Sequence, residues 1–277
     1  MIRRWIDTGG RGGVVVGIAV AELLLAWCLG AALCWDFAPS FAAHPRGAFA
    51  IFDDGGRFAG ELLARPLGSS GLLVGVVLAV HGVAWALLAG ALPVLAANPS
   101  VRAHRAAAES LRRAPSVLTL AAMHAVLLGV AALAASSVAS WASTVATTSP
   151  SSPVSTLHHL AGPFLGLGLA VAIGAWHDVS VMHAMARGRS AVSAASSALA
   201  QMLVHPLETV GAGLAFRAAG WVMPGVAFVA AGLFERRASA APLLALAAVQ
   251  HLAVLGRVHA RTKWMLWLAA RLPRGIA

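Results

Sequence analysis

The sequence has no tyrosine and little charge. Aspartate, glutamate, lysine and arginine together make up 11% of its 277 residues, whereas soluble domains carry roughly 25%. Hydrophobic residues make up 59% of the chain, and its mean hydropathy is +0.80. A water-soluble globular protein cannot bury so many apolar side chains, so the composition excludes a soluble globular fold. Without tyrosine, the nine tryptophans must supply any aromatic belt at a membrane surface.

Residues and motifs that carry catalytic chemistry are scarce as well. The two cysteines, Cys28 and Cys34, are six residues apart in one apolar segment. A helix separates them by roughly 9 Å along its axis, which is too far for a disulfide. The sequence contains no phosphate-binding loop, no zinc-protease motif and no nucleophile elbow. The chain is therefore expected not to be an enzyme.

Six apolar stretches are long enough to cross a bilayer, which takes about 20 residues of helix. They lie at 13–35, 71–97, 115–137, 160–185, 206–234 and 239–260. The connections are a long outer-side segment, two basic segments, a Ser/Thr/Pro-rich loop and a tight turn, at 36–70, 98–114, 186–205, 138–159 and 235–238. The sequence thus predicts an all-α, polytopic membrane bundle of six transmembrane helices, forming a single domain over 1–277.

The basic residues predict the orientation of this bundle. The net charge is +10, and the arginines cluster at the ends of apolar stretches, which suits membrane topology and argues against nucleic acid as a partner. With the N-terminus inside, the inner side holds Arg3, Arg4, Arg11, Arg102, Arg105, Arg112, Arg113, Arg187, Arg189, Arg261, Lys263, Arg271 and Arg274. The outer side holds only Arg46, Arg57, Arg65, Arg236 and Arg237. Both termini are therefore predicted to face the cytoplasm, in the bacterial cytoplasmic (inner) membrane.

An internal repeat relates two parts of the chain, at about 71–136 and 162–227. A shift of 91 residues aligns Gly71 with Gly162, Pro115 with Pro206, and the pair Ala84-Trp85 with Ala175-Trp176. Glycine, tryptophan and proline at fixed offsets are not easily produced by an alanine-rich background, so the alignment indicates a duplication. Each unit is a span, a surface helix and a second span, which makes the copies parallel repeats.

The connector within each repeat predicts an amphipathic helix at the inner surface. One apolar stripe is expected in each, made by Val101, Ala108 and Leu111 in the first and by Val192, Leu199 and Met202 in the second. Arginines on the other face suit an anionic leaflet; an ordinary solvated helix is the alternative. The C-terminal segment at about 261–273, with Trp264 and Trp267 among basic residues, predicts a third interfacial helix.

A few ionisable residues lie deep in the predicted spans. At 1.5 Å per residue, Glu22, Asp178 and Arg217 fall at nearly the same level of three spans, whereas Arg257 is shallower. Charges at such depth usually face the bundle interior and pair. We therefore predict a buried charge cluster in which Asp178, Glu22 or both hold Arg217. The cluster either fixes the register of the helices or forms a polar cavity.

Three histidines lie near the middle of their predicted spans: His81, His124 and His251. Neutral imidazoles at this depth can ligate haem b or a metal ion, as in membrane cytochromes. The alternative is that each histidine hydrogen-bonds a neighbouring helix. His81 has no histidine counterpart in the second repeat, where Ala172 stands. Neither a metal nor a cofactor is therefore expected, and haem b is kept as an alternative.

Asp178, the segment "SAVSAASSALAQMLVHP" and its closing Pro206 follow one another in a characteristic order. In this order the chain resembles a group of six-span bacterial membrane proteins similar to the membrane domain attached to some glycerophosphodiester phosphodiesterases. That group often has an arginine within a few residues of the acid, whereas Val-Ser-Val follows Asp178 here. The resemblance covers about residues 70–265 and implies no catalytic residue, because the soluble phosphodiesterase domain is missing from it.

These features together predict a non-enzymatic integral membrane protein that organises the membrane or supports a partner subunit. Membrane lipids are the expected partners, with another membrane protein or a second copy of the chain as further partners. Two alternatives stay open. One is a transporter of a small molecule or ion with a buried polar site, and the other is a b-type haem-binding electron carrier.

Overall fold

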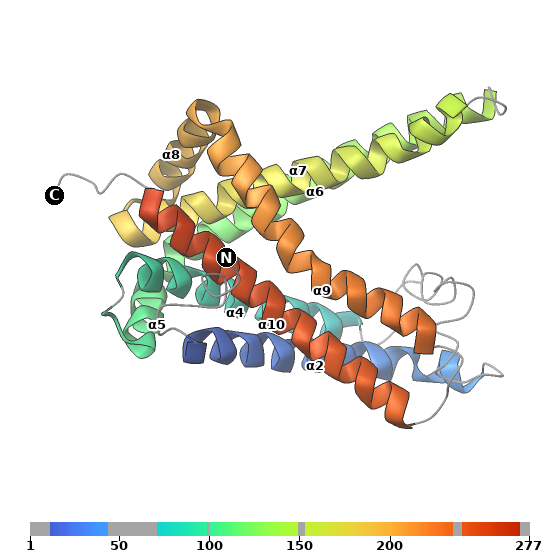
Figure 1. The fold of residues 1–277 in the computed structure, drawn as a ribbon, viewed down its shortest axis with the longest axis horizontal. Coiled ribbons are helices and arrows are strands. Elements are labelled where there is room, and N and C mark those ends of the chain that lie inside the picture. The colour runs from blue at the N-terminus through green and yellow to red at the C-terminus, as the bar shows by residue number, and fades with distance from the viewer. Residues whose placement is uncertain (1–11, 44–70, 99, 149–152, 235–239, 272–277) are drawn as a thin grey trace. The chain divides into compact units, whose positions relative to one another are not determined.

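Helices make up the regular structure of the part of the chain that the computed structural model describes, residues 12–43, 71–98, 100–148, 153–234 and 240–271 (Figure 1). This confirms the predicted all-α class for these residues. The α-helices are α2 (Gly12–Ala42), α4 (Gly71–Ala97), α5 (Ala103–Arg112), α6 (Ala114–Thr148), α7 (Pro153–Arg187), α8 (Ala191–Val204), α9 (Ala212–Phe234) and α10 (Ala240–Arg271). A π-helix, η2 (Leu207–Gly211), precedes α9.

The chain divides into two compact units. The first unit takes its residues from 1–85 and 218–263, and the second unit takes them from 86–217 and 264–277. In the second unit α6 packs along α7, and α8 and η2 pack against α7. The single domain predicted from the sequence stays a prediction.

Within the described residues, α6 and α7 contain the two segments that are long and apolar enough to cross a membrane. Their apolar segments are Ala114–Val145, with a mean hydropathy of 2.2, and Ala161–Arg187, with a mean hydropathy of 1.5. The large side chains of Val126, Val130 and Leu133 on α6 are exposed, as lipid-facing residues would be. These two helices support a membrane protein, although only weakly by themselves; six spans remain a prediction.

Small residues make the contact between α6 and α7. A Cβ added to Gly162 of α7 would lie 2.6 Å from the Cβ of Ala139 and 2.8 Å from the carbonyl oxygen of Ala135. A Cβ added to Gly166 would lie 3.0 Å from the Cβ of Ala135. The two helices can therefore approach this closely only because these positions carry no side chain.

The helices run further than the sequence predicts at the α6–α7 connection. α6 continues to Thr148 and α7 begins at Pro153, so most of the predicted loop at 138–159 is helical. The serines and threonines of this stretch fit inside the helix: Ser143 Oγ donates to the Ser140 carbonyl at 2.7 Å, and Thr144 Oγ1 donates to the same carbonyl at 3.1 Å. Bonds of this kind satisfy the hydroxyl groups without ending the helix.

α10 also corrects a prediction, because it runs without a break to Arg271. The separate interfacial helix expected at about 261–273 is wrong: through Arg271 this segment is the end of α10. No proline stands between Pro242 and Pro273, so nothing in this stretch removes a helical hydrogen bond. α2 likewise extends to Ala42. The rest of the outer-side segment and the turn at 235–238 lie outside the described residues.

Each of the two segments that the sequence predicts to be repeats contains a long helix, a short helix and a long helix. The first runs through α4, α5 and α6, and the second through α7, α8 and η2–α9. Each short helix is tied to the preceding long one. Ser110 Oγ of α5 donates to the Leu87 carbonyl of α4 at 2.7 Å, and Trp176 Nε1 of α7 donates to the Ala195 carbonyl of α8 at 3.1 Å.

Candidate functional site: the Asp178–Arg217 ion pair

Asp178 lies in the most enclosed part of α7. All residues from 174 to 185 are buried, because α6, α8 and η2 pack around this end of the helix. The side chain of Asp178 is 4% exposed and that of Arg217, on α9, is 33% exposed. A carboxylate in such surroundings is strongly destabilised by the loss of water unless charge and hydrogen bonds replace it.

Two hydrogen-bond donors share one oxygen of the Asp178 carboxylate. Arg217 Nη2 donates to Asp178 Oδ2 at 2.7 Å, and Trp264 Nε1 of α10 donates to the same oxygen at 3.2 Å. The indole of Trp264 is itself buried. The charge of Asp178 is thus compensated by residues from two other helices, and the contact joins α7, α9 and α10 within the second unit.

Two glycines make room for this arrangement. A Cβ added to Gly174 would lie 2.6 Å from Arg217 Cζ, so the guanidinium lies directly against the backbone of α7. A Cβ added to Gly213 would lie 3.2 Å from the Cβ of Ala175 and 3.5 Å from the Trp264 ring. Gly174 could have been found in the sequence, because it precedes Asp178 by four residues and therefore shares its helix face. The role of Trp264 could not have been found in the sequence, because a tryptophan among basic residues predicts a position at the membrane surface.

Glu22, the third member of the predicted charge cluster, has a different partner. In the first unit Arg257 Nη2 donates to Glu22 Oε2 at 2.7 Å. The side chain of Arg257 is 47% exposed, whereas that of Glu22 is 8% exposed. The predicted cluster is thus divided between two ion pairs. The depths estimated from the sequence place Arg257 nearer the membrane surface than Glu22, so they do not predict Arg257 as its partner.

Two of the predicted haem ligands, His124 and His251, each contact another aromatic ring. His124 stacks on His177, with ring centroids 4.5 Å apart and an interplanar angle of 22°. His251 contacts Trp27 edge-on at 5.7 Å, and the side chain of His81 lies outside the described residues. Among the residues that the structure describes, no three His, Cys, Asp or Glu side chains are grouped as ligands of a metal ion.

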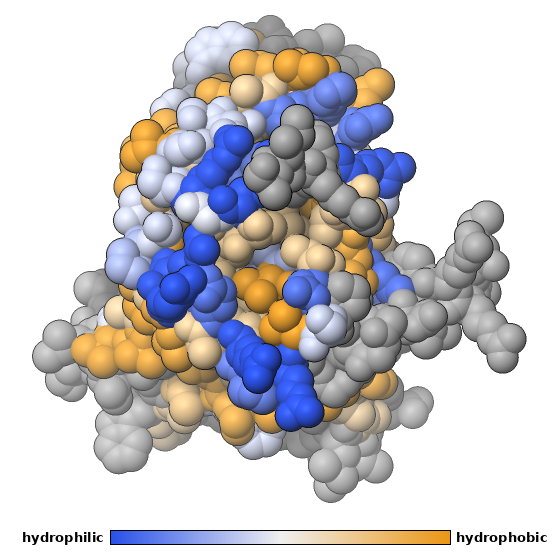
Figure 2. All heavy atoms as spheres, turned by 90° about the vertical axis from the view of Figure 1, so that its left-hand side faces the viewer, coloured by the Kyte–Doolittle hydropathy of each residue, from blue (hydrophilic) through white to orange (hydrophobic). Residues whose placement is uncertain are grey.

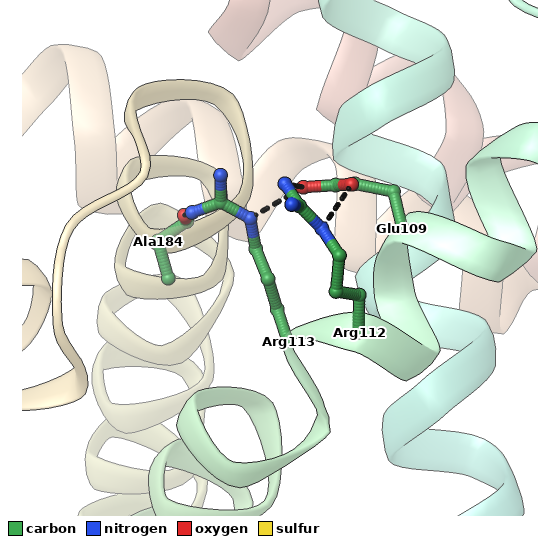
Figure 3. A network of polar contacts seen from close by, with 4 residues as sticks. All are labelled: Glu109, Arg112, Arg113 and Ala184. Carbon is green, nitrogen blue, oxygen red and sulfur yellow. Dashed lines mark hydrogen bonds and ion pairs between the residues drawn. The ribbon is translucent and has the colours of Figure 1, made fainter.

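A second polar network ties α5 to the end of α7 (Figure 3). Glu109 accepts hydrogen bonds from Arg112 Nε at 3.0 Å and from Arg113 Nε at 2.6 Å. These bonds lower the pKa of Glu109 to about 2 and raise the pKa of Arg112. Arg113 Nη1 also donates to the Ala184 carbonyl at 3.0 Å. This bond anchors the α5–α6 junction on the last turns of α7.

The chemistry of the Asp178 site favours a structural role. Its carboxylate is nearly inaccessible, and one of its oxygens already accepts two hydrogen bonds. Such an arrangement fixes the positions of three helices and leaves little of the carboxylate for a substrate. Comparison of the chain with family models, with curated proteins and with solved structures finds no match.

Proposed function

We propose that the chain is a non-enzymatic protein of the bacterial cytoplasmic membrane that organises lipid at the inner leaflet through its two short helices, α5 and α8. In this proposal it crosses the membrane six times, with both termini in the cytoplasm, and its two repeats arose by duplication. The basic connectors and the apolar α6 and α7 support this topology. The Asp178–Arg217 pair then holds the helices in place.

The observation that carries the proposal is the outward face of α8. The helix packs on α7 with small residues, Ala191, Ala194, Ala195 and Ala198, which are buried. Its large apolar residues point the other way: Val192, Leu199, Leu203 and Val204, continued by Leu207, are all exposed. Leaving such side chains in water forfeits roughly 25 cal/mol per Å² of apolar surface. A lipid surface removes that cost, and this is how an interfacial helix binds.

The surroundings of α8 suit an anionic leaflet in particular. Arg187 and Arg189 lie directly before the helix, and each basic residue near a leaflet with negative lipids contributes about 1 kcal/mol. Hydrophilic side chains gather on the face of the molecule where α5 and α8 lie (Figures 1 and 2). Apolar contact and charge therefore act together, which is the requirement for a stable surface helix.

The experiment that tests the proposal measures how deeply α8 lies in a membrane. The two native cysteines are replaced by serine, and single cysteines at Leu199, Leu203 or Ser190 are labelled with the fluorophore NBD in vesicles of phosphatidylglycerol and phosphatidylcholine. Labels at 199 and 203 are expected to resist reduction by dithionite added on the side of α8. The label at the N-cap, 190, is expected to be reduced rapidly. Equal rates at all three positions would contradict the proposal.

The two alternatives from the sequence have their own tests. A transporter needs Asp178 to face water, and this carboxylate is 4% exposed. Flux of a small molecule that is lost in Asp178→Asn would favour that function. Purified protein with the Soret absorption of haem would favour an electron carrier, with His124 or His251 as the first ligands to replace.

A further inference from the structure

A cavity of about 440 Å³ lies in the second unit, apart from the ion pair at Asp178. Its walls come from the end of α7, from α8 and η2, and from the last turns of α10. Neither Asp178 nor Arg217 lines it. The charged residues around it are Arg187, Arg189, Arg271 and Glu208.

The cavity is electropositive. Three arginines and one glutamate leave it with a formal charge of +2 when His183 and His205 are neutral. Arg189 Nη1 donates to Ser197 Oγ, and the guanidinium of Arg271 lies over the Trp267 ring at 4.0 Å. Within the described residues, no ion pair joins Arg189 or Arg271 to a carboxylate. Their positive charge is therefore available to a ligand.

The wall formed by η2 has an unusual backbone. Residues Leu207–Gly211 form a π-helix, a rare geometry that is frequent at functional sites. Thr209 within it is buried and donates to the His205 carbonyl at 2.7 Å. On the α8 side, Gln201 is held by a hydrogen bond between its Oε1 and His183 Nε2 at 3.1 Å. The polar lining is thus anchored by its own hydrogen bonds.

The apolar face of α8 continues to this cavity. Val204 lines the cavity and is also one of the exposed apolar residues of α8. Leu203 and Leu207, the next large residues along that face, are exposed. A ligand with a charged head and an apolar tail would therefore find contacts for both parts, the head among the arginines and the tail along α8.

We propose that this cavity binds a phosphate group, and that the group is the headgroup of an anionic phospholipid in the inner leaflet. The planar guanidinium donates two parallel hydrogen bonds to phosphate oxygens, which makes arginine the preferred residue for this ligand. Basic pockets between helices on the cytoplasmic side of membrane proteins bind such headgroups. The lipid source rests on the proposed function, whereas phosphate binding itself does not.

The competing interpretation is that the arginines only complement the ends of their helices. Arg187 and Arg271 stand in the last turns of α7 and α10, where positive charge is favourable without any ligand. That role requires no preference among lipids. It also predicts that removing an arginine lowers thermal stability without changing lipid affinity.

The test titrates the delipidated full-length chain, in neutral-detergent micelles, with fluorescent phosphatidylglycerol. Arg189→Gln and Arg271→Gln are compared with Arg257→Gln, which removes the same charge from a position on α10 that belongs to the first unit and does not line the cavity. Losing a charge-assisted hydrogen bond to phosphate is expected to raise the Kd about tenfold in each cavity variant. The control variant is expected to change it less than about twofold. Circular dichroism verifies folding, and Arg271→Gln, at an exposed helix end, keeps the test valid if Arg189→Gln unfolds.

Competition by unlabelled molecules separates the possible sources of the phosphate. Displacement by phosphatidylglycerol but not by phosphatidylcholine supports the lipid headgroup, and displacement by inorganic phosphate at equal concentration assigns the site to a free anion. Equal displacement by both lipids, or an equal loss of affinity in all three variants, would overturn the proposal. Because this titration needs no bilayer, it can succeed even if the depth measurement on α8 fails.

Discussion

Replacing Asp178 by asparagine tests whether the ion pair holds the helices together. The substitution keeps the shape of the side chain and an oxygen that can accept from Trp264, but it leaves Arg217 without its opposite charge. Removing one partner of a buried pair costs about 3–5 kcal/mol. Because the side chain of Arg217 is 33% exposed, water offsets part of this cost, and we expect about 3 kcal/mol.

This loss should be visible in thermal unfolding followed by circular dichroism in detergent. One kcal/mol shifts the Tm of a protein of this size by about 2–4 °C, so Asp178→Asn should lower the Tm by about 6–12 °C. Adding Arg217→Gln removes the uncompensated charge, and the double variant should be more stable than the sum of the two single effects by about 1–3 kcal/mol. A Tm within about 2 °C of wild type would refute the reasoning.

Glu22→Gln serves as the matched comparison. It breaks the other ion pair, whose arginine, Arg257, is 47% exposed and can be hydrated when its partner is lost. The expected loss is about 1 kcal/mol, near the upper end of values for exposed pairs. A loss of stability larger than that caused by Asp178→Asn would show that the exposure of the arginine does not determine how much stability is lost.

Three further predictions concern the packing around the site. The pKa of Glu109 is lowered from 4.5 to about 2. The stabilisation by its ion pairs is therefore fully present above pH 4.5 and is lost as the pH falls through about 2. The Tm difference between wild type and Glu109→Gln should shrink as the pH is lowered between these two values. Gly162→Ala should destabilise by about 1–3 kcal/mol, because its Cβ would meet α6, whereas Gly168→Ala, with nothing within 4 Å, should change the Tm little. Trp176→Phe removes the hydrogen bond to the Ala195 carbonyl, so hydrogen exchange should quicken in α8; unchanged exchange would show that this bond does not hold the helix.

Much of the helical fold follows from the apolar pattern alone. Helices stand at each of the six predicted spans, and the short helices α5 and α8 fall within the predicted connectors. Helix ends were harder to predict because the sequence signals there conflict. Serine and threonine in 138–159 suggest a loop, but α6 accommodates side chains such as Ser143, whose hydroxyl bonds back to the Ser140 carbonyl. Tryptophans among basic residues suggest a surface helix after 261, but α10 continues and buries Trp264.

The sequence predicts which charged residues form the candidate site, but it does not predict which residues they contact. Counting depth along each helix brought Asp178 and Arg217 to one level, and the structure pairs them. Depth says nothing about which helices are adjacent, so Arg257 was missed as the partner of Glu22. The cavity was missed for the same reason. In the sequence, Arg189 serves only to predict the orientation in the membrane. Arg271, which also lines the cavity, stands 82 positions after Arg189 in the chain.

The central claim is that α5 and α8 lie on one side of a membrane that α6 and α7 cross. Single cysteines at Ala107 of α5, Ser190 at the N-cap of α8 and Ser143 near the far end of α6, all exposed, can be labelled with an impermeant maleimide in spheroplasts after Cys28 and Cys34 are replaced by serine. We expect labelling at 143 in intact spheroplasts, and at 107 and 190 only after lysis. Labelling of 107 and 190 from opposite sides, or of all three positions from outside, would contradict the account.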